Sequence, residues 1–192
     1  MTAASDDAAA RDDPAAPNAA AANAAAGRPR LVLVGAPGAG KTTVGTELAR
    51  RWGVQLCDTD QVVEAARGRT VADIFVDEGE ATFRALEEQA VAEALSSCTG
   101  VVALGGGAVL SEVTRERLVG LPVTFLDVGL PVSSARVGLG ANRPLLLGNV
   151  RGQLRALLDA RRPLYEQVSA FSVDTDHLSV EQVADEVERQ LS

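Results

Sequence analysis

The segment that most constrains the fold is 35–42, a glycine-rich stretch between an apolar run and an amphipathic one. It reads Gly-Ala-Pro-Gly-Ala-Gly-Lys-Thr and matches the phosphate-binding pattern G-x-x-x-x-G-K-[ST]. Its glycines let backbone N–H groups converge on phosphate oxygens, while the lysine reaches the β- and γ-phosphates. Lys41 is the only lysine of the chain and stands where the pattern demands one. We therefore expect ATP to bind at Gly38, Ala39, Gly40, Lys41, Thr42 and Thr43.

The rest of the chain alternates short apolar runs with amphipathic stretches. This alternation is typical of a parallel sheet covered by helices. We expect strands at 31–34, 54–57, 101–104, 122–128 and 171–173, and helices at 42–52, at 80–95 and after the Ser179–Gln182 capping box. The sequence therefore predicts an α/β fold with three layers, α/β/α, around a five-stranded parallel sheet, as in P-loop NTPases.

Composition limits the number of domains and the class of partner. The chain has 192 residues and a net charge of −8, which suits one domain and argues against binding to nucleic acid or an anionic membrane. Residues 1–27 are about half alanine and offer no large apolar side chain after Met1, so we expect a disordered tail before a domain at 28–192. Neither a signal peptide nor a long apolar span is visible, which indicates a cytoplasmic protein.

The scarcity of histidine and cysteine narrows the chemistry. With one histidine and two cysteines, a zinc site built from these residues is nearly excluded. Cys57 and Cys98 are expected to be reduced and buried rather than part of a disulfide framework. His177 is expected to lie exposed in a turn.

A nucleotide site alone does not name a reaction. Recognition of guanine uses an Asn-Lys-x-Asp motif, which the single lysine rules out. A motor-type ATPase would have a strand ending in Asp-Glu, whereas the strand at 122–128 offers Asp127 without the glutamate. Asp58 and Asp60 end the second expected strand, and the carboxyl ends of parallel strands line the ligand crevice. Asp58 and Asp60 are therefore the competing candidates for the carboxylate beside the metal.

Several ordered motifs together resemble the shikimate kinases, small enzymes of the nucleoside monophosphate kinase fold. The resemblance runs from Leu31 to Leu191 and rests on GAPGAGKT at 35–42, DTD at 58–60, FRALE at 83–87, GGG at 105–107, RPLL at 143–146 and RRPLY at 161–165. It implies transfer of the γ-phosphoryl group of ATP to the 3-hydroxyl of shikimate, with Mg²⁺, in the synthesis of chorismate and the aromatic amino acids.

The chemistry of the acceptor agrees with this resemblance. Shikimate is a carboxylate with several hydroxyls, so its binding needs guanidinium groups and a hydrogen-bond acceptor. Arg84 and Arg161 are candidates for the carboxylate and Asp60 for the hydroxyls. Read alone, Arg84 would form an ordinary helix-surface ion pair with Glu87 or Glu88. Its place in the FRALE motif favours a substrate role, with Glu87 orienting it.

The resemblance also assigns roles that the residues alone do not give. It implies that Gly105, Gly106 and Gly107 bring backbone N–H groups to the substrate, and that Asp58 lies beside the water shell of Mg²⁺ and near the hydroxyl that reacts. The phosphate-loop motif itself predicts that the Thr42 hydroxyl is a ligand of this ion. It implies that Arg136 stacks on adenine. We expect a lid at about 136–146, in which Arg143 closes over the phosphates. The predicted catalytic residues are Lys41, Asp58 and Arg143.

Two other functions stay open from the residues alone. Another small-metabolite kinase of the same fold, such as a gluconate kinase, would lack only the two arginines and the DTD motif. A non-catalytic ATP-binding regulator would need no paired arginines. The expected partners are ATP and shikimate, without nucleic acid or membrane, and a monomer is expected, although no pattern bears on the oligomeric state.

Overall fold

The structure is a computed structural model that describes residues 27–138 and 150–192. Five parallel strands form one sheet in the order β2-β3-β1-β4-β5. They are β1 Leu31–Val34, β2 Leu56–Asp58, β3 Val101–Ala103, β4 Val123–Asp127 and β5 Phe171–Asp174. The helices are α2 Lys41–Trp52, α3 Thr59–Arg67, α4 Val71–Ser97, the 3₁₀ turn η1 Ala108–Leu110, α5 Glu112–Leu118, α6 Leu130–Gly138, α7 Val150–Val168 and α8 Val180–Leu191. The expected α/β fold is confirmed.

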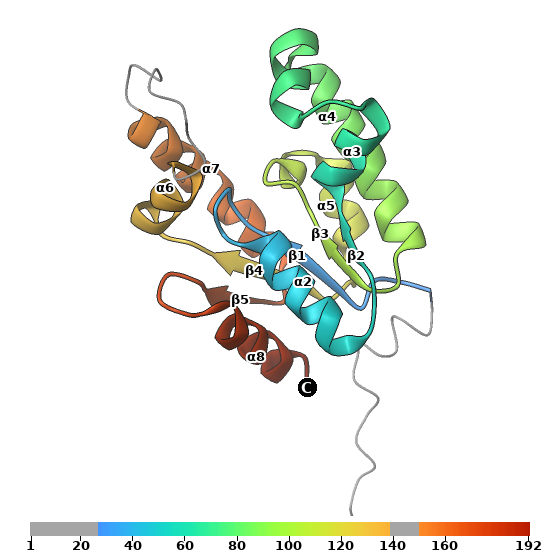
Figure 1. Cartoon of the computed structure of the whole chain (residues 1–192), viewed down its shortest axis with the longest axis vertical. Helices are drawn as coiled ribbons and strands as arrows, with labels where there is room; N and C mark the ends of the chain where they lie inside the picture. Colours follow the sequence, from blue (N-terminus) through green and yellow to red (C-terminus); the bar gives the residue numbers. More distant parts are fainter. Residues whose placement is uncertain (1–26, 139–149) are drawn as a thin grey trace, which may run out of the picture.

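Helices cover both faces of the sheet (Figure 1). Helices α2 and α8 pack together on one face, while α4, α5 and α7 cover the other. All four residues of β1 are completely buried because this strand is central and enclosed from both sides. No helix in the described part of the chain is long and apolar enough to cross a membrane.

The second strand starts later than expected, at Leu56 rather than at Val54. Gly53 ends α2 in a left-handed conformation, with φ of 63°, and the N–H of Val54 donates to the carbonyl of Ala49 at 3.0 Å. The backbone of Val54 therefore completes the end of the helix and does not join the sheet.

The two cysteines are both free but differ in burial. Cys98 is buried, as expected. Cys57 is only half-buried because β2 is an edge strand, which corrects the expectation that this residue is buried.

The two aspartates of the DTD motif belong to different elements. Asp58 ends β2 and caps α3, because its Oδ1 accepts from the N–H of Asp60 at 3.0 Å and from that of Gln61 at 3.3 Å. Asp60 lies in the first turn of α3. The expectation that both end the strand is wrong for Asp60, because capping turns the chain into a helix directly after Asp58.

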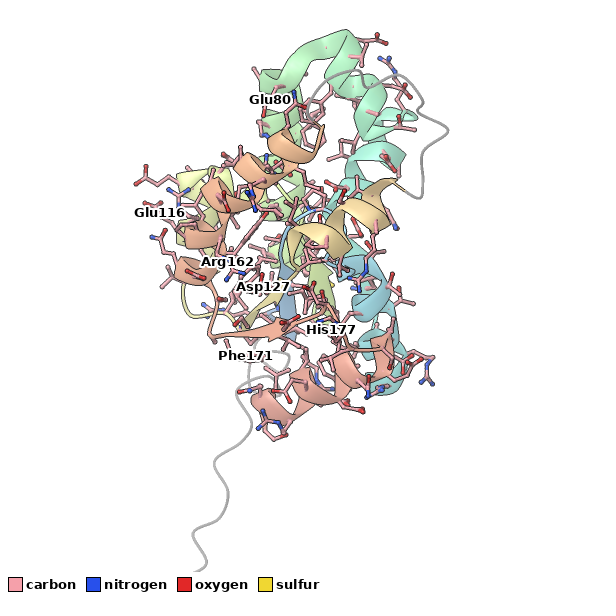
Figure 2. The ribbon with its side chains drawn as sticks, turned by 90° about the vertical axis from the view of Figure 1, so that its left-hand side faces the viewer. Glu80, Glu116, Asp127, Arg162, Phe171 and His177 are labelled. Carbon is pink, nitrogen blue, oxygen red and sulfur yellow. The ribbon has the colours of Figure 1, made fainter. Side chains whose placement is uncertain are left out.

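Two other helix boundaries match the sequence. Helix α4 is interrupted at Gly79, whose φ of 84° is non-helical, so the expected helix at 80–95 is its second part. The capping box of Ser179 and Gln182 opens α8 as expected. His177 is exposed just before that box (Figure 2). The predicted tail lies outside the described residues except for Gly27, and so does the lid beyond Gly138, including Arg143.

Candidate active site

Three of the segments that carry predicted site residues leave the sheet at the carboxyl ends of its strands (Figure 1). The phosphate loop follows β1, Asp58 ends β2, and the three glycines follow shortly after β3. These three strands are neighbours in the order β2-β3-β1 and run parallel, so the segments that leave them meet at the same edge. The topology therefore brings residues from distant parts of the sequence together.

The phosphate loop depends on glycine for its backbone shape. Gly38 and Gly40 have φ values of 81° and 88°, which side chains rarely tolerate. Lys41 opens α2 and its Nζ donates to the carbonyls of Gly35 at 2.8 Å and Ala36 at 3.1 Å. Burial lowers the pKa of Lys41 to about 8, and nearby Asp60 and Asp58 oppose that change. The ammonium group of Lys41 therefore lies against the backbone of the phosphate loop.

The predicted nucleotide residues that the structure describes line two hollows beside this loop, which share Gly40, Thr43 and Arg136. Gly38, Gly40, Lys41, Thr42, Thr43 and Arg136 line one of them, and Ala39 lines the second, which Val180 and Val183 of α8 also line. Arg136, on α6, donates to the carbonyls of Gly38 at 3.0 Å and Thr175 at 2.9 Å. It therefore joins the loop to the turn after β5. Thr175 was not singled out by the sequence, because nothing in its pattern marks it as a partner of Arg136.

Thr42 and Asp58 form a direct contact between α2 and the end of β2. The Thr42 hydroxyl donates to Asp58 Oδ2 at 2.6 Å. Both groups are oxygen donors of the kind that Mg²⁺ prefers. Among the described residues, no group of three or more His, Cys, Asp or Glu side chains could hold a metal.

Two acidic side chains face each other across the first glycine of the GGG segment. A Cβ on Gly105 would overlap Asp60 Oδ1 and Glu87 Oε1, so both carboxylates lie against this glycine. Burial raises the pKa of Asp60 to about 6, and repulsion from Glu87 and Asp58 adds to that rise. The N–H of Gly105 donates to the Thr59 hydroxyl at 2.9 Å. Sequence reasoning missed Thr59, which lies hidden inside the DTD motif.

The guanidinium of Arg84 lies between Glu87 and the third glycine, Gly107. Its Nη1 donates to Glu87, which is 3% exposed, and its Nε to Glu80 at 3.3 Å. The guanidinium carbon also lies 5.4 Å from the ring centre of Phe75 and 5.3 Å from that of Phe83. These contacts fix the orientation of the Arg84 side chain, and Glu87 contributes to this as the sequence analysis expects. The helix-surface pairing to Glu87 is present too, but on the buried side of α4.

Arg161 approaches the same segment from α7. Its Nη1 donates to the carbonyl of Gly106 at 3.0 Å. The hydroxyl of Tyr165 donates to the same carbonyl at 2.6 Å, and its ring stacks on Phe125 with 5.1 Å between centres. Sequence reasoning missed this role of Tyr165, although it is the only tyrosine of the chain and belongs to the RRPLY motif.

Known proteins match this chain over most of its length. The family model for shikimate kinase matches residues 37–192. The shikimate kinase of Salinispora arenicola is 58% identical over 159 residues, or 83% of this chain and 95% of the relative. That of Thermobifida fusca is 52% identical over 164 residues, or 85% of this chain and 95% of the relative.

Solved structures agree with the sequence matches. Shikimate kinase from Acinetobacter baumannii in complex with shikimate has a TM-score of 0.74 and 36% identity, and the match covers 84% of this chain and 89% of that one. The enzyme from Aquifex aeolicus has a TM-score of 0.73 at 27% identity, covering 84% and 95%. The nucleoside monophosphate kinase type of fold, expected from the motifs, is therefore confirmed. With this fold, these motifs and these relatives, the chain belongs to the shikimate kinase family.

Proposed function

We propose that this protein transfers the γ-phosphoryl group of ATP to the 3-hydroxyl of shikimate. One observation carries the proposal. Two arginines on different helices, Arg84 and Arg161, converge on the segment Gly105–Gly107 at the sheet edge that also holds the phosphate loop. Two guanidinium groups near the half-buried carboxylate of Asp60 suit a small acceptor that carries both a carboxylate and hydroxyls.

The phosphate half of the site supplies positive charge where the transferred group carries negative charge. The backbone of the loop and the N-terminus of α2 offer N–H donors, and Lys41 adds a full charge. In the complex, Nζ of Lys41 exchanges its two carbonyl acceptors for phosphate oxygens, which compensate its burial better. Arg136, which the resemblance assigns to stacking on adenine, lies beside the phosphate loop, where it donates to the carbonyls of Gly38 and Thr175.

Thr42 and Asp58 would hold Mg²⁺. The ion usually keeps several waters and needs only one or two protein oxygens, so this pair is a sufficient donor set. When bound, Mg²⁺ neutralises charge on the phosphates during transfer. Asp58 also caps α3, which fixes its carboxylate at the junction of β2 and the acceptor site.

The acceptor half orients the hydroxyl that reacts. Arg84 and Arg161 bind the carboxylate, and the ionised carboxylate of Asp60 accepts from ring hydroxyls. Phosphoryl transfer gains most of its rate from positioning and charge stabilisation, so such an arrangement suffices without a strong base. Arg143, which lies outside the described residues, is proposed from its RPLL motif as the arginine that closes over the phosphates.

A coupled assay of ADP formation tests this function. We expect Mg²⁺-dependent turnover that shikimate stimulates and that gluconate or a nucleoside monophosphate does not. Turnover with either of the latter, without stimulation by shikimate, would refute the assignment. Calorimetry with shikimate in the presence of ADP separates an enzyme from an ATP-binding regulator, since only the enzyme should bind shikimate.

A further inference from the structure

An ion pair next to the acceptor site has no part in the function proposed above. Arg162, on α7, donates through Nη2 to both carboxylate oxygens of Asp127, at 2.6 Å for Oδ1 (Figure 2). Its Nη1 donates to Glu166 in its own helix at 3.2 Å, and its guanidinium carbon lies 5.8 Å from the ring centre of Phe125. The pair joins α7 to the last residue of β4.

Two residues close to Arg162 in the sequence contact the GGG segment. Arg161 precedes Arg162, and Tyr165 lies one turn later; both donate to the carbonyl of Gly106. This part of α7 is therefore attached on one side to the acceptor site and on the other to β4. A rotation of the helix that released Arg162 would also move Arg161 relative to Gly106.

The backbone of α7 is weakened where these side chains attach. Pro163 lies inside the helix, directly after Arg162. Proline lacks the N–H that would donate to the carbonyl of Asp159, and its ring crowds that carbonyl. Contacts of the side chains must therefore fix the local direction of the helix. The ion pair with Asp127 supplies such a contact within one residue of Arg161.

Asp127 is a rigid anchor for this purpose. Its carbonyl accepts from both the N–H and the hydroxyl of Thr175, each at 2.9 Å, and its strand pairs with β5. These backbone contacts do not involve the carboxylate. Removing the charge of Asp127 should thus leave β4 in place and release only α7.

We propose that the Asp127–Arg162 ion pair positions Arg161 for the acceptor's carboxylate, which makes Arg162 a positioning residue of the shikimate site. The inference rests on the proposed function. Because Arg162 is about half-exposed, the pair is a modest contributor, and its loss should raise the Kd for shikimate about three- to tenfold. The KM for shikimate should rise in parallel, with a smaller change in kcat.

The test compares Arg162→Ala, Asp127→Asn and the double variant in the full chain. Calorimetry measures the Kd for shikimate with ADP present and the Kd for ADP alone, and a melting curve reports stability. Arg162→Lys keeps the charge but cannot reach Asp127 and Glu166 through two separate nitrogens, so it should restore part of the affinity. Glu166→Gln removes the other partner of Arg162, and Arg189→Ala removes an exposed arginine paired to Glu186 on α8. Both controls should bind shikimate normally.

The inference is supported if both single variants weaken shikimate binding selectively and the double variant adds little to either. It is overturned if shikimate affinity is unchanged, if Glu166→Gln has the same effect, or if affinity for ADP and the Tm fall in proportion, which would indicate a purely structural pair. Turnover of shikimate by the wild-type protein is measured first. Its absence would refute the proposed function, whereas normal wild-type turnover with unaffected variants refutes the positioning role alone.

Discussion

Gly107→Ala should weaken shikimate binding because the new methyl group displaces the side chain of Arg84, a residue far from Gly107 in the sequence. A Cβ at Gly107 would lie 2.6 Å from Nη2 of Arg84, with Nη1 and Cζ closer still. Side chains do not approach this closely, so the guanidinium must move. Gly107 itself has φ of −100° and ψ of −9°, which alanine adopts without strain. The effect should therefore act through Arg84.

The expected loss of affinity follows from the hydrogen bonds to shikimate that the displaced guanidinium of Arg84 no longer makes. Hydrogen bonds to a charged group contribute about 1.5–3 kcal/mol, which corresponds to a loss of affinity of about 10- to 150-fold. The cost to folding is smaller, because the group that must move is the tip of a flexible side chain. We expect a decrease of about 1 kcal/mol in the free energy of unfolding, or a few degrees in Tm.

Calorimetry with shikimate in the presence of ADP measures this effect, and a double-mutant cycle with Arg84→Ala assigns it. In the Arg84→Ala background, the new methyl group meets no guanidinium, so Gly107→Ala should change the Kd less than about twofold. Wild-type affinity in Gly107→Ala would contradict the close packing of these residues. An equal loss in both backgrounds would show that Gly107 acts on the substrate without Arg84.

Three further perturbations test the site. Since the pKa of Asp60 is raised to about 6, the carboxylate gains a proton as pH falls through 6, and shikimate affinity measured by calorimetry should fall there in the wild type but not in Asp60→Asn. Since the pKa of Lys41 is lowered to about 8, nucleotide binding above pH 8 should take up a proton, seen as a dependence of binding enthalpy on the buffer; no uptake would contradict a contact with phosphate. Arg84→Ala and Arg161→Ala should each raise the KM for shikimate, with the Kd for ADP near that of the wild type. Weaker ADP binding with an unchanged KM for shikimate would show that these arginines belong to the nucleotide half of the site.

The parts of this protein that its sequence determines are those built from neighbouring residues. The phosphate loop needs glycines that adopt positive φ and a lysine at one spacing, and both lie within eight residues. Capping of α8 by Ser179 is likewise a contact over three residues. The order of apolar and amphipathic segments predicts the layers, since burial on both faces requires it.

Contacts between distant residues were decided only by the tertiary structure. The distance between Gly106 and Tyr165, or between Asp127 and Arg162, depends on strand order and on how α7 lies across the sheet, and no local pattern encodes either. Asp60 is one residue whose position a local contact decided against the prediction. Asp58 caps α3, so Asp60 lies in a helix and not at the end of the expected strand. Hydrogen bonding and backbone preference act over a few residues, so they are visible in the sequence. The contact of Arg161 with Gly106 exists only once α7 has packed beside the sheet, whereas Arg84 is paired with Glu87 three residues along its own helix, a contact that the sequence predicts.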